Sequence, residues 1–159
     1  MTENVYTAAS SARTSAFLGT RNSVLLTADD TNGAAGVIDI EVQPGAGAPL
    51  HTNSREALIW YVVDGMLTLH TEDGVRELSQ GSGAFLPIGS THQFINTSDR
   101  PARALLVCVP GGLERFFFDL AGRLPADVPA GPPPREAAEV LQQVAERYGV
   151  EIHLESPVP

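Results

Sequence analysis

The stretch from Gly81 to Asn96 reads G-S-G-A-F-L-P-I-G-S-T-H-Q-F-I-N. It holds two short runs, A-F-L at residues 84–86 and Q-F-I-N at residues 93–96, and the apolar and aromatic residues in each are typical of a β-strand. Pro87 and Gly89 lie between these runs, and both residue types favour turns. His92 follows this turn and directly precedes the second run. The segment therefore predicts two strands joined through a turn, with a histidine at the start of the second strand.

Strand patterns of the same kind continue on both sides of this segment. Residues 37–42 alternate, with Ile38 and Ile40 on one face and Asp39 and Glu41 on the other. Turn chemistry such as Glu-Asp-Gly at 72–74 separates the runs at close intervals. The remaining strands are expected at residues 24–27, 58–63, 66–71, 75–78 and 102–109. Many short strands with close turns predict an all-β sandwich or barrel.

The C-terminal part of the chain changes character. Residues 113–120 place apolar side chains on one face of a helix, and residues 135–148 show a second helical stripe that ends before Gly149. Five prolines fall within 121–134, which predicts an extended connector. We expect a flexible N-terminal arm at 1–16, a barrel at 17–120, and a connector and helix at 121–159 that pack on the barrel or on a partner subunit.

Composition excludes several classes of protein. The 159 residues carry a formal net charge of −9, which argues against a nucleic-acid partner because phosphate binding needs a basic face. No run reaches the roughly 20 apolar residues of a membrane helix, and the first residues lack the pattern of a secretory signal. Cys108 is the single cysteine and lies in an apolar run, so we expect a buried thiol. These features predict a cytoplasmic protein.

Two segments carry a resemblance to a known family. The spacing of Gly81, Pro87, Gly89, His92 and Asn96 resembles the second signature of the cupin superfamily. The first signature, G-x5-H-x-H-x3,4-E-x6-G, is matched at positions 45, 51 and 65. The flanking letters P-G-A-G-A-P-L-H and Y-V-V-D-G look like the small quercetinase-like single-domain cupins. The resemblance implies a double-stranded β-helix, which is a jelly-roll barrel.

The resemblance also implies a metal centre made of three histidines and one carboxylate. His51 and His92 match two of these ligands, whereas Asn53 and Leu58 occupy the other histidine position and the glutamate position. Glu56 lies two residues before the glutamate position, and a shift in strand register would bring it inward. An amide is a poor ligand for a transition metal and leucine is none. We therefore expect a degenerate metal site and no required cofactor, although His51 and His92 leave a divalent transition metal possible.

Without a metal, the barrel interior becomes an apolar pocket for a hydrophobic, polyketide-like or aromatic molecule. The residues expected to line it are Asp39, Leu58, Trp60, Phe85 and Phe94. Asp39 is included because the resemblance places a carboxylate at its position in many relatives, although its strand pattern puts it on the polar face.

Three functions stay open. The first is an enzyme of the cyclase, isomerase or dehydratase kind, with His51 and His92 as acid and base and Asn53 as hydrogen-bond donor. The second is a metal-dependent dioxygenase that resembles quercetinases. The third is a non-catalytic small-molecule-binding module. We also expect a homodimer, because the run at 58–63 is apolar on both strand faces.

Overall fold

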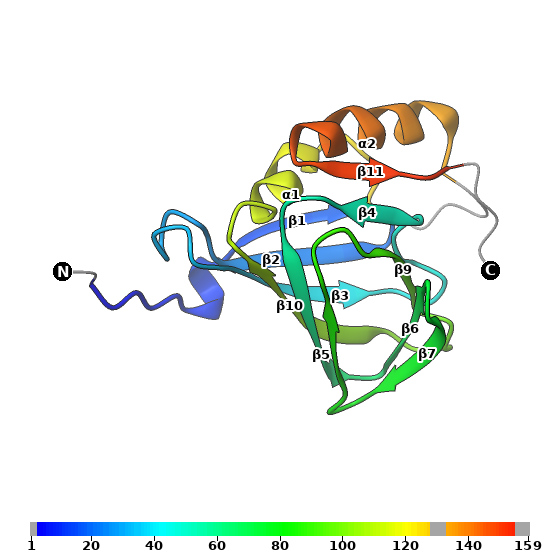
Figure 1. The fold of residues 1–159 in the computed structure, drawn as a ribbon, viewed down its shortest axis with the longest axis horizontal. Coiled ribbons are helices and arrows are strands. Elements are labelled where there is room, and N and C mark those ends of the chain that lie inside the picture. The colour runs from blue at the N-terminus through cyan, green and yellow to red at the C-terminus, as the bar shows by residue number, and fades with distance from the viewer. Residues whose placement is uncertain (1–2, 128–132, 155–159) are drawn as a thin grey trace.

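A computed structural model describes residues 3–127 and 133–154 and shows two antiparallel sheets packed around one hydrophobic core (Figure 1). The first sheet has the strand order β1-β2-β3-β10-β5-β8, and the second has the order β11-β4-β9-β6-β7. The strands are β1 Arg13–Phe17, β2 Thr20–Leu26, β3 Gly36–Val42, β4 His51–Asn53, β5 Ala57–Asp64, β6 Met66–Thr71, β7 Gly74–Ser79, β8 Gly83–Leu86, β9 Thr91–Ile95, β10 Ala102–Val109 and β11 Val150–Ile152. The predicted all-β fold is confirmed.

The alternation of residues in β3 determines which face of the first sheet meets the core. Ile38 and Ile40 are at most 1% exposed, and they pair with Leu106 and Ala104 of β10, which are also buried. On β5, Leu58 and Trp60 point to the same interior. Because side chains alternate along a strand, the residues between these positions form the outer face of the sheet.

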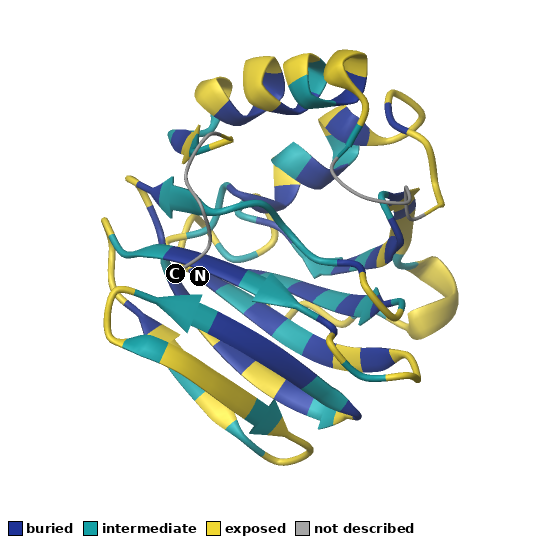
Figure 2. Cartoon of the chain, turned by 90° about the vertical axis from the view of Figure 1, so that its right-hand side faces the viewer, coloured by how far each residue is buried: buried dark blue, intermediate teal, exposed yellow. Residues whose placement is uncertain are grey.

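Two α-helices and the last strand cover one end of the two-sheet body. α1 (Glu114–Leu120) contacts β1 and β3, and α2 (Arg135–Arg147) contacts α1 and β11. Figure 2 shows α2 with its buried residues toward the barrel and its exposed residues toward solvent. A one-turn 3-10 helix, Ala9–Ser11, precedes β1. β1 begins at Arg13, within the range expected to be a flexible arm, because residues 13–17 pair with β2. Part of the predicted connector, residues 128–132, lies outside the described residues.

The start of α1 is fixed by a buried carboxylate. Glu114 is fully buried and accepts hydrogen bonds of 2.7 Å from the backbone N–H groups of Ala28 and Gly112. A Cβ on Gly36 would lie 2.3 Å from Glu114 Oε2, so only glycine leaves room for this side chain. The predicted burial of Cys108 is confirmed. Among the described helices, none has the length and hydropathy needed to span a membrane.

Candidate functional site

Two histidines face each other at the centre of the candidate site. His51 begins β4 and His92 is the second residue of β9, and these two residues are direct partners in the antiparallel register. Direct partners on adjacent strands project to the same face of the sheet. Their imidazole rings lie 4.3 Å apart between centroids and are tilted by 58°. The structure thus brings together the two histidines that the sequence predicts for the site.

Each imidazole has its proton position set by a backbone carbonyl. His51 Nδ1 lies 2.8 Å from the carbonyl oxygen of Pro49, and His92 Nδ1 lies 3.2 Å from that of Ser90. A carbonyl oxygen only accepts, so the neutral rings carry their proton on Nδ1. The lone pair then lies on Nε2 of both rings. Within the described parts of the chain, His92 Nε2 is buried and has no hydrogen-bond partner.

Both imidazoles are held in the neutral form. Burial lowers the pKa of His51 to about 3, and the neighbouring His92 acts in the same direction. Burial also lowers the pKa of His92 from its ordinary value. The charged form of each ring loses hydration inside the barrel, and a charge on one ring repels a charge on the other. At neutral pH the site therefore presents two uncharged bases, and the pair accepts one proton more readily than two.

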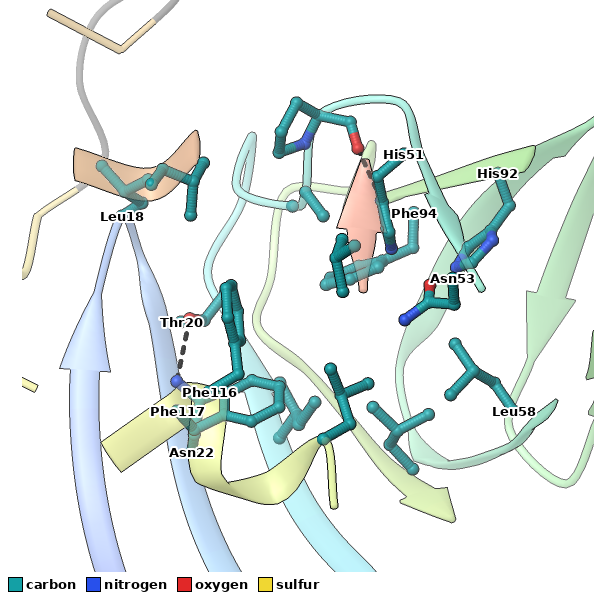
Figure 3. Close-up of a pocket in the computed structure, with 18 of the residues that line it drawn as sticks. Leu18, Thr20, Asn22, His51, Asn53, Leu58, His92, Phe94, Phe116 and Phe117 are labelled. Atoms are coloured by element: carbon teal, nitrogen blue, oxygen red, sulfur yellow. Dashed lines mark hydrogen bonds between the residues drawn. The ribbon is translucent and has the colours of Figure 1, made fainter. Parts of the chain in front are cut away.

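The histidines line an apolar pocket of about 90 Å³ inside the barrel (Figure 3). Leu58, Trp60 and Phe94 form part of its wall, as the sequence predicts, and the Trp60 and Phe94 rings lie 4.8 Å apart. Gly47 closes another part, where a Cβ would lie 2.0 Å from the carbonyl oxygen of Phe94. Residues of the C-terminal cover complete the wall: Leu113, Phe116, Phe117, Leu141, Val150 and Ile152.

The remaining two positions of the expected metal centre hold uncharged side chains in the same pocket. Asn53 and Leu58 are each 2% exposed and line the pocket together with the histidines. Asn53 Oδ1 has no hydrogen-bond partner within residues 3–127 and 133–154. The set offers two imidazole nitrogens and a neutral amide, with no anionic ligand. These residues do not fit a centre of three histidines and a carboxylate, and no cluster of three or more potential ligands occurs among the described residues.

Glu56 does not supply the missing carboxylate. It is 4% exposed and does not line the pocket, and it lies beside Gly112, whose added Cβ would be 3.4 Å from Glu56 Oε1. Burial raises the pKa of Glu56 to about 7, and the nearby Glu114 adds to this effect. The strand register therefore places Glu56 beside the start of α1, outside the histidine pocket.

Two predicted lining residues lie outside the pocket. Asp39 is on the outer face of the first sheet, where Arg103 Nε donates a hydrogen bond of 3.0 Å to its Oδ1. Phe85 is 65% exposed, and its strand partner is Ile59, which also faces outward. Both corrections follow from strand alternation. Ile38 and Ile40 point inward on either side of Asp39, and Leu86 points inward next to Phe85.

Several pocket residues were missed by the sequence analysis. Thr20 and Asn22 on β2 line the pocket on the side away from His92 and Asn53 (Figure 3). Val150 and Ile152 reach it from β11, a strand of three residues that pairs with β4. Alternation along residues 20–26 could have predicted Asn22, because it is two residues from Val24 and therefore points to the same, inward face of the strand. A three-residue strand gives no comparable signal.

The fold and the site define a small antiparallel β-barrel with a ligand-sized interior pocket that contains two histidines. Residues 38–108 match the family described as the cupin domain. Residues 38–108 of this chain therefore form a cupin domain. No functionally curated protein matches the sequence.

Several solved structures are similar to this chain. KdgF from Halomonas sp. is 16% identical, with 71% of this chain and 99% of that chain covered and a TM-score of 0.63. The polyketide cyclase RemF from Streptomyces resistomycificus is 22% identical, with 69% and 80% covered and a TM-score of 0.57. A sugar phosphate isomerase from Silicibacter pomeroyi is 29% identical, with 55% of this chain covered and a TM-score of 0.49. The chain spans 59% of the length of that isomerase.

Proposed function

We propose that the pocket binds a hydrophobic small molecule and catalyses its cyclisation, isomerisation or dehydration by proton transfer. The observation that carries this proposal is the pair of neutral imidazoles, His51 and His92, which lie side by side in the lining of an apolar pocket and have Nδ1 bonded to backbone carbonyls. RemF is named a polyketide cyclase, so a reaction of this class occurs in another protein of the same fold.

The low basicity of the empty site suits a reaction that creates a negative charge. In the apolar pocket an imidazolium is unfavourable until an anion forms beside it. Removal of a proton next to a substrate carbonyl gives an imidazolium and an enolate together, and each stabilises the other. An imidazolium beside an enolate is therefore more stable in this pocket than an imidazolium alone in the pocket without substrate. The imidazolium then returns the proton that it removed to another atom of the substrate, while the second imidazole remains neutral.

Asn53 is the proposed hydrogen-bond donor to the developing oxyanion. Its side chain lines the same pocket as the two histidines, and Figure 3 shows it beside His92. An amide N–H stabilises an enolate oxygen without adding a proton that titrates. Leu58, on the adjacent wall, excludes water and so strengthens this interaction.

The size of the pocket limits what binds without movement. Its volume of about 90 Å³ is below the roughly 150 Å³ of a cavity that holds one benzene molecule. A polyketide-like or aromatic substrate therefore displaces part of the cover formed by Phe116, Phe117 and Ile152. Ile152 belongs to β11, which pairs only with the three-residue strand β4 in the described sheet, so few strand contacts hold this part of the cover in place.

Deuterium exchange tests the proposed proton transfer without knowledge of the natural substrate. The probe is phenylacetone, which carries an acidic C–H between a ring and a carbonyl, and loss of its proton signal in heavy water is followed by NMR. The wild type should exceed the buffer rate, and His51→Gln and His92→Gln should lose at least tenfold. His153→Gln is the matched control, because His153 bonds to Thr52 outside the pocket lining and should keep the full rate.

The two alternative functions give different results in the same experiment. Binding of phenylacetone with no catalysed exchange would favour the non-catalytic binding module. Exchange or oxygen consumption that a chelator abolishes and added metal restores would favour the dioxygenase, for which the closeness of the two imidazole rings, 4.3 Å between centroids, is the supporting observation. Exchange that is unchanged in both histidine variants would contradict the acid–base assignment.

The expected homodimer is proposed on the outer face of the first sheet. Ile59, Tyr61, Phe85 and Val109 are 42%, 48%, 65% and 40% exposed and lie on the adjacent strands β5, β8 and β10. A contiguous apolar area of this kind is unusual on the surface of a monomer. Its sheet continues directly into the charged Asp39–Arg103 pair, which suits the polar rim of an interface between two copies.

A further inference from the structure

The pocket has a second polar end that the proposed reaction does not use. Asn22 is 1% exposed and lines the pocket between apolar neighbours on β2 and α1. Figure 3 shows Asn22 and Thr20 near Phe117, across the pocket from His92 and Asn53. Asparagine at an inward strand position is uncommon, because a buried amide needs partners for both its oxygen and its nitrogen.

The hydrogen bonds around Asn22 fix the orientation of its amide. Thr20 Oγ1 lies 2.9 Å from the carbonyl oxygen of Phe17, which only accepts, so the threonine hydroxyl donates its proton there. Thr20 Oγ1 therefore acts as acceptor toward Asn22, 3.2 Å away, and the atom of Asn22 that faces it is Nδ2. The amide oxygen is left on the other side of the group.

Asn22 Oδ1 is consequently an unused acceptor. It is buried and has no hydrogen-bond partner within the part of the chain that the structure describes. An unsatisfied buried acceptor weakens the fold, and a leucine of similar shape would avoid the loss. Since the threonine hydroxyl is already committed, a donor on a molecule inside the pocket would satisfy the amide oxygen.

We propose that Asn22 is a specificity residue that accepts a hydrogen bond from a hydroxyl or N–H group at the end of the ligand remote from the histidines. This inference rests on the proposed function, because it concerns the same pocket. The substrate class is thereby narrowed to an apolar body with a donor at one end and the reactive C–H and carbonyl at the other. Hydroxylated aromatic or polyketide-like molecules satisfy this requirement, whereas ethers, esters and hydrocarbons at that end do not.

A pair of ligands of equal shape tests the assignment. Hydroquinone, kept reduced under nitrogen, has a donor at each end, and p-xylene replaces both hydroxyls by methyl groups. Binding is followed through the indole N–H signal of Trp60 in ¹H–¹⁵N spectra, because Trp60 is the single tryptophan and lines the pocket. Each affinity is measured in the wild type, in Asn22→Leu, and in Ser23→Ala, a control on the outer face of the same strand.

Asn22→Leu should weaken hydroquinone about 5- to 10-fold, which is the effect of one hydrogen bond, and should leave p-xylene unchanged or tighter. Ser23→Ala should change neither. The melting temperature of unliganded Asn22→Leu should equal or exceed that of the wild type, whereas a structural role for Asn22 would lower it.

Three results would overturn the proposal: equal effects of Asn22→Leu on both ligands, no saturable binding of hydroquinone to the wild type, or a lower melting temperature in both Asn22→Leu and Asn22→Ala. The exchange of phenylacetone is scored separately. If the histidine variants lose exchange and Asn22→Leu keeps the wild-type preference for hydroquinone over p-xylene, only this inference is refuted. If the histidine variants keep exchange and Asn22→Leu loses that preference, only the proton-transfer function is refuted.

Discussion

The histidine pair should contribute to stability near neutral pH, and mild acid should remove this contribution before most carboxylates begin to titrate. The pKa of His51 is lowered from 6.5 to about 3, and that of His92 is lowered as well, by burial in both cases. Below about pH 6.5 the unfolded chain binds a proton on His51 and the folded chain does not. The free energy of unfolding therefore falls by about 1.4 kcal/mol per pH unit for this ring, and His92 acts in the same direction. Between pH 6.5 and pH 5, His51 alone contributes a loss of about 2 kcal/mol.

Glu56 opposes this effect and has to be removed to reveal it. Its pKa is raised from 4.5 to about 7, so over that range the folded state binds a proton that the unfolded chain lacks. Acidification through the same window then stabilises the fold. The histidine effect is isolated in Glu56→Gln, which keeps the shape of the side chain and does not titrate.

Urea unfolding of Glu56→Gln and of Glu56→Gln/His51→Gln, each at about pH 7 and about pH 5, gives the required difference. The first variant should lose about 2 kcal/mol more than the second on acidification. Equal losses in the two variants would refute the conclusion that His51 is held neutral by the pocket.

Three further predictions follow from the same contacts. Glu56→Gln should raise the free energy of unfolding by about 3 kcal/mol near pH 8, because burial raises the pKa of Glu56 from 4.5 to about 7. Near pH 4 the same substitution should not change the free energy of unfolding, and an equal gain at both pH values would contradict the burial argument. The double variant Asn53→His/Leu58→Glu restores the four ligands of the cupin signature and should bind about one divalent metal ion per subunit in isothermal titration calorimetry. If the double variant binds no metal, the geometry of the pocket rather than the types of residue prevents binding. Tyr61→Glu or Phe85→Glu should convert the proposed dimer to a monomer in light scattering; a wild type that is monomeric at micromolar concentration would remove the proposed interface.

The longer strands could be read from the sequence because each is bounded by turns and has one buried face. Residues 37–42 show this most clearly, since alternation places Ile38 and Ile40 in the core as predicted. The histidine pair was also predictable, though only through the resemblance to cupins. Nothing in the spacing between positions 51 and 92 indicates by itself that they are partners on adjacent strands.

The wrong and missed assignments of pocket residues fall where the strand is short or where the deciding partner lies far away in the sequence. Phe85 lies in a four-residue strand, and its hydrophobicity suggested the pocket although its alternation with Leu86 places it outside. Asp39 was assigned from the family pattern against its own strand parity, and its partner Arg103 is 64 residues away in the sequence. The proposed role of Asn22 could not be predicted from the sequence. It depends on the hydrogen bond from Asn22 Nδ2 to Thr20, which leaves the amide oxygen without a partner among the described residues.

The metal content of the purified protein tests the central claim most directly. Tag-free protein is expressed with Fe, Mn, Ni, Cu and Zn supplied, and the metal per subunit is determined by plasma mass spectrometry for the wild type, His51→Ala and His92→Ala. A pocket that works through two neutral imidazoles predicts well below one metal per subunit in all three proteins. Near-stoichiometric metal in the wild type that disappears in both variants would contradict the account and make His51 and His92 metal ligands.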